Sequence, residues 1–365
     1  METGLFFALG LGLLVLGGEL LVKGASRLAA LMKISPLVVG LTVVAYGTSS
    51  PELATNLIAV HENKLDIAVG NVLGSNIFNV FFILGISALI VPLVVHRQVV
   101  RLDVPIMIGA SLMLLLLGLD GALNRFDGIL LVAAVIFYTV FIIRESRREQ
   151  RQDEAPEAVP DPASAEGRGK TWLVSIALVL GGLVALVLGS NWLVDSAIVI
   201  AKGLGVSELV IGLTLVAAGT SLPEVITSIV AALRGQRDIA VGNVVGSNIY
   251  NILAILGLSS ILAEDGIPLS PATLGFDIPV MIGAAVACLP IFFTGHRIAR
   301  WEGALFLLYY VAYTLFLILK SLQHDSLPLF SGWMLGYVLP LTAVTLMVYF
   351  LRAMVEHSRR PAASR

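Results

Sequence analysis

Two segments of the chain place hydroxyl groups, a proline and a carboxylate side by side within strongly apolar sequence. The first reads VVAYGTSSPELATN over residues 43–56, and the second reads LVAAGTSLPEVITS over residues 215–228. Pro51 and Pro223 each remove a backbone N–H from a helix and clash with the carbonyl one turn earlier. The carbonyl oxygens freed in this way, the neighbouring hydroxyls and the carboxylates form the ligand set that Ca²⁺ and Na⁺ prefer.

The carboxylates of Glu52 and Glu224 carry the charge of this candidate site. A carboxylate in the middle of a bilayer is costly unless water or a partner relieves it. Two facing carboxylates also repel each other unless a positive charge lies between them. One Ca²⁺, two Na⁺ or two protons would each balance the pair, so one bound species can replace another. This equivalence is the physical basis of ion exchange.

A second polar motif follows each of these segments. It reads VGNVLGSNIFN over residues 69–79 and VGNVVGSNIYN over residues 241–251. Residues four apart lie on one face of a helix, so each motif presents a serine and an asparagine together; these candidate ligands are Ser75, Asn79, Ser247 and Asn251. The small residues also permit close helix packing. The remaining asparagines are predicted to hold the ends of the broken helices; they are Asn71, Asn76, Asn243 and Asn248.

Both motifs belong to one long internal repeat. Residues 35–85 and 207–257 align without gaps at an offset of 172, and 30 of these 51 positions are identical. The similarity between the halves extends beyond these residues, since an Asp-x-Pro occurs at Asp103 and again at Asp277. The chain is therefore built from two homologous halves. If each half holds an odd number of spans, the second half is inverted in the membrane, as in many secondary transporters.

The composition places the chain in the membrane class. Only 13% of the residues are charged and 57% are hydrophobic, whereas a soluble domain carries about 25% charged residues. Apolar runs long enough to cross a core of ~30 Å lie at 4–22, 37–60, 67–92, 104–119, 127–143, 172–192, 207–232, 239–262, 277–294, 303–320 and 332–351. The predicted fold is an all-α polytopic membrane protein with two inverted five-helix repeats and one extra C-terminal helix.

These runs also predict the organisation of the chain. The predicted units are a first repeat at 1–143 with its motif at 35–85, a cytoplasmic linker without regular structure at 144–171, a second repeat at 172–321 with its motif at 207–257, and an extra helix with a cytoplasmic tail at 322–365. Alternating the loops between two sides puts 19 of the 23 Lys and Arg residues on one side. By the positive-inside rule, the N-terminus is expected outside and the C-terminus in the cytoplasm.

Three other acidic residues are given ordinary structural roles. Asp103 and Asp277 precede helical runs and are expected to be N-caps. Glu19 lies four residues before Lys23 and is expected to pair with it on the first span.

The doubled GTS-x-PE and GSN-x-x-N motifs resemble those of the calcium/cation antiporter superfamily, in particular the alpha repeats of its prokaryotic sodium/calcium exchanger branch. The resemblance covers nearly the whole chain. It implies ten core helices, a central site shared by the two repeats and Na⁺-driven Ca²⁺ transport by alternating access. The eleventh predicted span exceeds the usual ten.

The resemblance also implies roles for individual residues. Glu52 and Glu224 would be shared by Ca²⁺ and Na⁺, with the carbonyls of Thr48 and Thr220 completing the Ca²⁺ site. The flanking Na⁺ sites would use the serines and two further carbonyls, which are Ser49, Ser221, Ser75, Ser247, Ala45 and Ala217. Asn79 and Asn251 would line the middle of the site. Some relatives that require K⁺ have Asp where this chain has Asn251, so no K⁺ requirement is expected.

Several other classes of function are disfavoured. The lone Cys288 and the scattered histidines form neither a disulfide framework nor a metal site. No nucleophile–histidine pair or phosphate loop indicates an enzyme, and no cofactor, nucleic acid or obligate protein partner is expected. The expected partners are Ca²⁺, Na⁺ and the lipid bilayer of the cytoplasmic membrane. A Ca²⁺/H⁺ antiporter that uses the same glutamates, and less so a passive cation channel, stay open as alternatives.

Overall fold

The computed structural model describes residues 2–153, 165–204 and 217–359. Its α-helices are α1 (Glu2–Met32), α2 (Pro36–Val39), α3 (Ala45–Thr48), α4 (Ser50–His61), α5 (Leu65–Phe78), α6 (Gly85–Ile90), α7 (Val104–Leu117), α8 (Arg125–Asp153), α9 (Ala165–Gly203), α11 (Ala217–Gly219), α12 (Leu222–Leu233), α13 (Arg237–Tyr250), α14 (Gly257–Leu262), α15 (Ile278–Phe293), α16 (Arg300–Ser321), α17 (Leu327–Trp333) and α18 (Leu339–Arg359). The prediction of an all-α polytopic membrane protein is confirmed.

Short helical segments of other types join or interrupt the α-helices. Six are π-helices, in which the backbone hydrogen bonds span five residues; they are η1 (Gly40–Val44), η2 (Asn79–Leu84), η3 (Val99–Asp103), η7 (Asn251–Leu256), η8 (Thr273–Asp277) and η9 (Met334–Val338). One is a 3₁₀ turn, η4 (Gly118–Asp120). Four two-residue strands complete the elements of the described residues; they are β1 (Leu93–Val94), β2 (Ala122–Leu123), β3 (Ile267–Pro268) and β4 (Arg297–Ile298).

Within the described residues, nine helices are long and apolar enough to cross a membrane. The pair Pro36–Thr48 and Ser50–His61 adds a tenth span that is bent by 43° at its break. The predicted span at 207–232 lies partly outside the described residues, which include its second part as the apolar helix α12. The total of eleven spans therefore stays a prediction.

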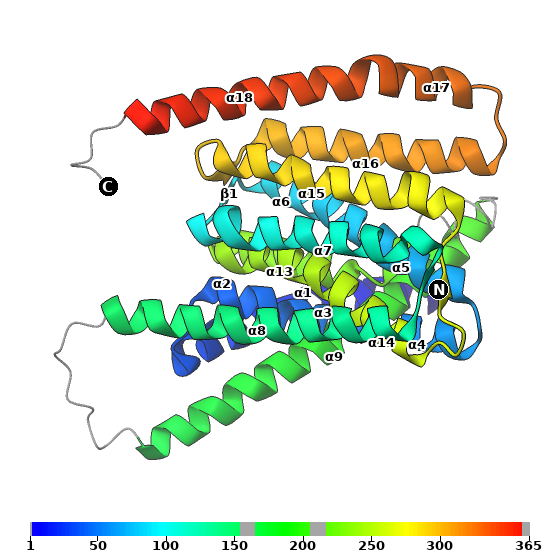
Figure 1. The fold of residues 1–365 in the computed structure, drawn as a ribbon. Helices are drawn as coiled ribbons and strands as arrows, with labels where there is room; N and C mark the ends of the chain where they lie inside the picture. Colours follow the sequence, from blue (N-terminus) through cyan, green and yellow to red (C-terminus); the bar gives the residue numbers. More distant parts are fainter. Residues whose placement is uncertain (1, 154–164, 205–216, 360–365) are drawn as a thin grey trace.

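The two halves run through the bundle in opposite directions. In Figure 1, α5 and α6 follow each other toward one end of the bundle, whereas α13 and α14 follow each other toward the other end. The small sheets repeat this relation, because β1 pairs with β4 and β2 pairs with β3, both antiparallel. Each sheet thus contains one strand from each half, so backbone hydrogen bonds connect the two halves at both ends of the molecule.

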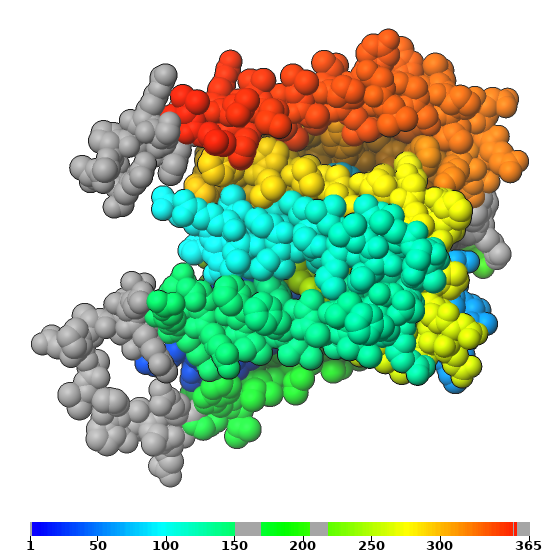
Figure 2. Space-filling view, viewed as in Figure 1, coloured from blue at the N-terminus to red at the C-terminus, as the bar shows by residue number. Residues whose placement is uncertain are grey.

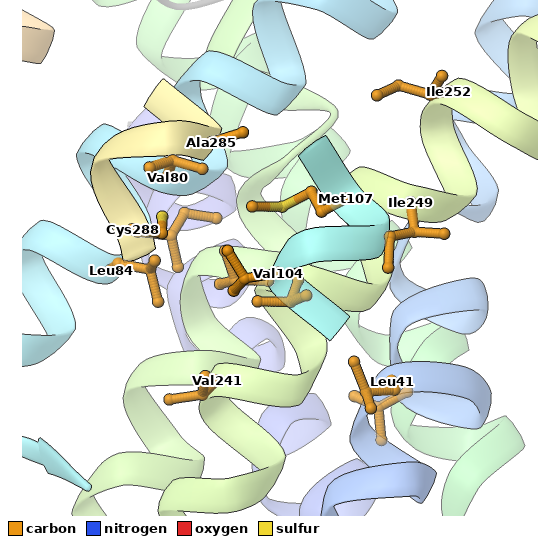
Figure 3. Packing of buried hydrophobic residues seen from close by; sticks show 14 of the residues in the cluster. Leu41, Val80, Leu84, Val104, Met107, Val241, Ile249, Ile252, Ala285 and Cys288 are labelled. Atoms are coloured by element: carbon orange, nitrogen blue, oxygen red, sulfur yellow. The ribbon is translucent and has the colours of Figure 1, made fainter. Parts of the chain in front are cut away.

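The centre of the bundle is built from the repeated motifs. In the most apolar windows of the spans Leu65–Ile90 and Arg237–Leu262, 72% and 94% of the residues are buried. Figure 3 shows Val80 and Leu84 of the first half beside Ala285 and Cys288 of the second. Polar motifs at this depth can only be stable if their hydrogen bonds are made within the protein.

The longest contact between the halves is the packing of α1 against α9. Both helices carry glycines at seven-residue spacing along the contact; they are Gly10, Gly17 and Gly24 on α1 and Gly182 and Gly189 on α9. A Cβ atom at Gly17 would lie 2.8 Å from the carbonyl oxygen of Gly182. The missing side chains therefore let the two backbones approach directly.

The C-terminal helices lie along one edge of the bundle. The span Leu327–Arg352 is 6% buried in its most apolar window, and Figure 2 shows it in orange and red along the outer edge. It packs against α15 and α16. Tyr309 donates a hydrogen bond of 2.6 Å to Thr342, and Phe293 packs against Phe350 with ring centroids 4.9 Å apart. This span therefore lies on the outside of the bundle.

Two predicted side-chain roles are wrong. The chain is already helical at Asp103 and Asp277, in η3 and η8, and neither side chain caps a helix. Asp103 instead accepts a 3.0 Å hydrogen bond from the Tyr138 hydroxyl. Glu19 forms its ion pair with Arg234 rather than with Lys23, because the tertiary structure brings the end of α12 beside α1. In addition, α8 and α9 extend from both sides into the segment predicted as a linker.

The α1–α9 contact yields a prediction about stability. We expect Gly17→Ala to lower the free energy of unfolding by about 1–3 kcal/mol, because the new methyl group overpacks a backbone contact. The melting temperature of the detergent-purified protein measures this change. Gly12→Ala is the matched control, since a Cβ there meets no atom within 4 Å. An equal loss of stability in both variants would contradict the proposed role of the contact.

Candidate cation site

The two glutamates lie directly after two helix breaks. Ser49 has φ −82° and ψ 10°, and Ser221 has φ −90° and ψ 6°, so both residues leave the α-helical conformation. A proline then stands at the start of α4 and of α12, where its missing N–H costs nothing. The clash predicted for a proline inside a helix is therefore wrong, because Pro51 and Pro223 begin a helix after the break instead of interrupting one. Glu52 and Glu224 follow in the first turn, and each is only 1% exposed. The local sequence thus places one buried carboxylate just beyond each break.

The two breaks are joined by reciprocal hydrogen bonds. Ser49 donates to Glu224 Oε1 at 2.8 Å, and Ser221 donates to Glu52 Oε1 at 2.8 Å. Because each serine lies three residues before the glutamate of its own half, this exchange brings both carboxylates to the boundary between the halves. Ser75 also reaches this place, with its Oγ 3.2 Å from the Oγ of Ser221.

Asparagines of the second motif form another reciprocal set. The side-chain amide of Asn76 donates to the backbone carbonyl of Asn248, and that of Asn248 donates to the carbonyl of Asn76, both at 3.3 Å. Asn79 donates to Asn248 Oδ1, and Asn251 donates to Asn76 Oδ1, both at 3.0 Å. Every donor in this set is used within the protein, so the crossing of α5 and α13 is stabilised by four hydrogen bonds.

These bonds leave four buried oxygens without a hydrogen-bond donor. They are Glu52 Oε2, Glu224 Oε2, Asn79 Oδ1 and Asn251 Oδ1. They come from equivalent positions of the two halves, and each parent side chain is 1% exposed. A buried acceptor that lacks a donor is costly, and a bound cation removes this cost. Two carboxylate and two amide oxygens are hard ligands of the kind that bind Ca²⁺ or Na⁺.

The remaining predicted ligands lie around this set. Thr48 donates to Asn243 Oδ1 at 3.1 Å, and Ser247 donates to the carbonyl of Ala45 at 3.4 Å. Thr220 stands beside Ser221 at the second break. Only the backbone of Ala217 is described, at the start of α11. Among the described residues there is no cluster of three or more His, Cys, Asp or Glu, so a metal bound here must rely on neutral oxygens besides the glutamates.

Two features of the site were missed from the sequence. The first is that Asn79 and Asn251 each begin a π-helix, η2 and η7. π-Segments within α-helices occur frequently at functional sites, and no residue pattern marks these two. The second is an outer pair of hydrogen bonds. Asn71 donates to the carbonyl of Glu52 at 3.3 Å and to Asn56 Oδ1 at 2.7 Å. The position of Asn56, one helical turn after the glutamate, is the signal that could have indicated it.

The predicted role of the other motif asparagines agrees with their contacts. Asn243 repeats the arrangement of Asn71, with bonds of 3.4 Å to the carbonyl of Glu224 and 3.0 Å to Ser228 Oγ. Asn76 and Asn248 cross-link the halves as described above. All four therefore hold helix ends and helix crossings in position around the unpartnered oxygens.

The asparagine crossing yields a second prediction about stability. We expect Asn76→Leu to lower the melting temperature strongly, because it leaves the side-chain amide of Asn251 without an acceptor and removes one of the hydrogen bonds to the carbonyl of Asn248; an unpaired buried group costs about 1–3 kcal/mol. The measurement is thermal unfolding in detergent. Asn191→Leu, at an exposed position of α9, is the control and should unfold near the wild-type temperature. A small effect at Asn76 would mean that the crossing does not depend on these bonds.

Comparisons with known proteins agree with this geometry. The family model described as sodium/calcium exchanger protein matches residues 3–144 and 174–319. The putative antiporter CaxA of Alkalimonas amylolytica is 37% identical over 316 residues, covering 85% of this chain and 96% of CaxA. The sodium/calcium exchanger MaX1 of Methanosarcina acetivorans is 36% identical over 342 residues, with the same two shares covered.

The fold is also that of a solved exchanger. The structure of the sodium-calcium exchanger NCX_Mj soaked with 10 mM Na⁺ and zero Ca²⁺ matches with a TM-score of 0.72 and 31% identity, covering 85% of this chain and 96% of that one. The family match ends before α17 and α18, so the C-terminal span lies beyond the shared part. The chain is a multi-pass membrane protein that belongs to the sodium/calcium exchanger family, whose members are transporters and not enzymes.

Proposed function

We propose that this protein exchanges Na⁺ for Ca²⁺ across the membrane by alternating access at a single central site. The observation that carries the proposal is the set of four buried oxygens without donors, which belong to Glu52, Glu224, Asn79 and Asn251. Its relatives MaX1 and NCX_Mj are named sodium/calcium exchangers, which supports the same pair of ions here.

The charge of the site explains why the two ions compete. The ionised pair Glu52 and Glu224 contributes a charge of −2, which one Ca²⁺ or two Na⁺ would neutralise. An empty site would leave two carboxylates facing each other in a medium of low dielectric, where their repulsion is strong. The protein therefore favours occupied states, and release of one ion is coupled to binding of the other.

The proposed ligands follow from the sequence motifs and the contacts. Glu52 and Glu224 are shared by both ions, and the carbonyls of Thr48 and Thr220 complete the Ca²⁺ site. The flanking Na⁺ sites use Ser49, Ser221, Ser75, Ser247 and the carbonyls of Ala45 and Ala217. Since Ser49 and Ser221 hold the glutamates in place through one oxygen each, the other carboxylate oxygens are left for the ion.

Proton coupling is the alternative for the same site. Two protons also neutralise the glutamate pair, and the relative CaxA is named only as a putative antiporter. A passive channel is disfavoured because the polar residues meet at one enclosed place between inverted halves, and channels usually repeat their filter around an axis normal to the membrane.

The orientation and the division of the chain belong to this proposal. By the positive-inside rule, the distribution of basic loop residues supports an N-terminus outside and a C-terminus in the cytoplasm. In Figure 1, the facing ends of α8 and α9 and the end of α18 lie at one end of the bundle, and the N-terminus lies at the other. One five-helix repeat lies on each side of the segment 144–171. Its relative in Escherichia coli is named inner membrane protein YrbG, which supports a cytoplasmic membrane.

Transport by the glutamate pair is tested with ⁴⁵Ca²⁺ uptake into proteoliposomes. Na⁺-loaded vesicles diluted into choline are expected to take up Ca²⁺, and K⁺-loaded vesicles are not. Glu52→Gln and Glu224→Gln should each abolish this uptake, because a neutral amide cannot balance the charge of Ca²⁺. Glu62→Gln is the control, since Glu62 is exposed and pairs with Lys64 at 2.6 Å. Uptake that ignores Na⁺ but follows a pH gradient would assign the pair to proton coupling instead.

Ion binding is tested separately by thermal unfolding. Ca²⁺ at roughly 100 times its dissociation constant is expected to stabilise the folded protein by about 2.7 kcal/mol, because only the folded state has the site. Removal of Ca²⁺ with a chelator should reverse the shift in melting temperature. Glu52→Gln should remove the Ca²⁺-dependent shift, and Glu62→Gln should retain it. A shift that survives in Glu52→Gln would place the Ca²⁺ elsewhere.

A further inference from the structure

The two halves differ at one buried position behind the glutamates. At the offset of 172, Asn56 on α4 corresponds to Ser228 on α12, and Ser259 on α14 corresponds to Ser87 on α6. All four side chains are at most 1% exposed. Asn56 therefore lies opposite Ser259 behind Glu52, and the two equivalent positions behind Glu224 are both serines, Ser228 and Ser87.

In the first half, both polar atoms of the Asn56 amide form hydrogen bonds. Its Oδ1 accepts from Asn71 at 2.7 Å, and its Nδ2 donates to the carbonyl of Ala68 at 3.0 Å and to Ser259 Oγ at 3.3 Å. Asn71 in turn holds the carbonyl of Glu52. A continuous chain of direct hydrogen bonds therefore leads from the glutamate to Ser259.

In the second half, the same chain stops early. Asn243 holds the carbonyl of Glu224 and donates to Ser228 Oγ at 3.0 Å. The hydroxyl of Ser87 has no hydrogen-bond partner, and neither has that of Thr227, the neighbour of Ser228. Since α12 packs against α6 as α4 packs against α14, the shorter serine leaves the two hydroxyls unconnected.

The two hydroxyls beside the shorter side chain are polar groups that a water molecule can bridge. A serine carries a hydroxyl where an asparagine carries a larger amide, and a buried water needs room for about one probe sphere and two to four polar partners. Ser228 and Ser87 supply two partners. We propose that an ordered water binds between Ser228 and Ser87. It would continue the chain of hydrogen bonds that begins at Glu224, as the side chain of Asn56 does for the chain that begins at Glu52.

The water itself is tested by stability, independently of transport. If the hydroxyl of Ser87 has no partner, Ser87→Ala should raise the melting temperature, because it removes an unsatisfied buried group. If a water bridges it to Ser228, Ser87→Ala should lower the melting temperature, as Ser259→Ala should by removing the bond from Asn56. We expect the lowering in both variants. An unchanged or raised melting temperature for Ser87→Ala alone would overturn the proposal.

A crystal structure that resolves ordered solvent gives the direct check. We expect one water within hydrogen-bond distance of Ser87 Oγ and Ser228 Oγ. In Ser228→Asn, the introduced amide should displace it and donate to Ser87 Oγ, as Asn56 does to Ser259. A direct bond between Ser87 and Ser228 in the wild type, with no water between them, would refute the assignment.

Discussion

Two buried carboxylates facing each other are the constraint on which the rest of this structure depends. Glu52 and Glu224 are almost fully enclosed, and each is held through one oxygen by a serine of the opposite half. Their other oxygens have no donor. Such a pair is stable only with positive charge between its members, so the fold acts as a frame that keeps a cation site open in an apolar surrounding.

The inverted repeat meets this constraint with few residue types. Because the halves are related by symmetry, a serine that serves one carboxylate implies a serine that serves the other, and the same holds for the asparagines of α5 and α13. The two small sheets and the glycine contact between α1 and α9 tie the halves together at their ends and along their length. The polar centre is therefore surrounded by contacts that involve both halves.

The two halves differ at a few positions, and these differences distinguish the two sides of the molecule. Ser228 replaces Asn56 and leaves Ser87 without a direct partner, and Glu19 reaches Arg234 where the other half has Asn191 and Glu62. Both departures distinguish the Arg234 side of the molecule from the Glu62 side. A transporter built from equivalent halves needs such differences if its two sides are to behave differently.

Much of this protein was determined by the sequence alone. The apolar runs predicted the helices, and the doubled motifs predicted that Glu52, Glu224 and the neighbouring serines and asparagines belong to one site, because a carboxylate inside an apolar span is costly without polar partners or a cation. Local sequence could not predict contacts between distant segments. The exchange of serines between carboxylates, the ion pair of Glu19 with Arg234 and the buried bond from Tyr138 to Asp103 all join residues more than thirty positions apart. Only the tertiary structure decided them, because helix packing selects which of many polar groups meet.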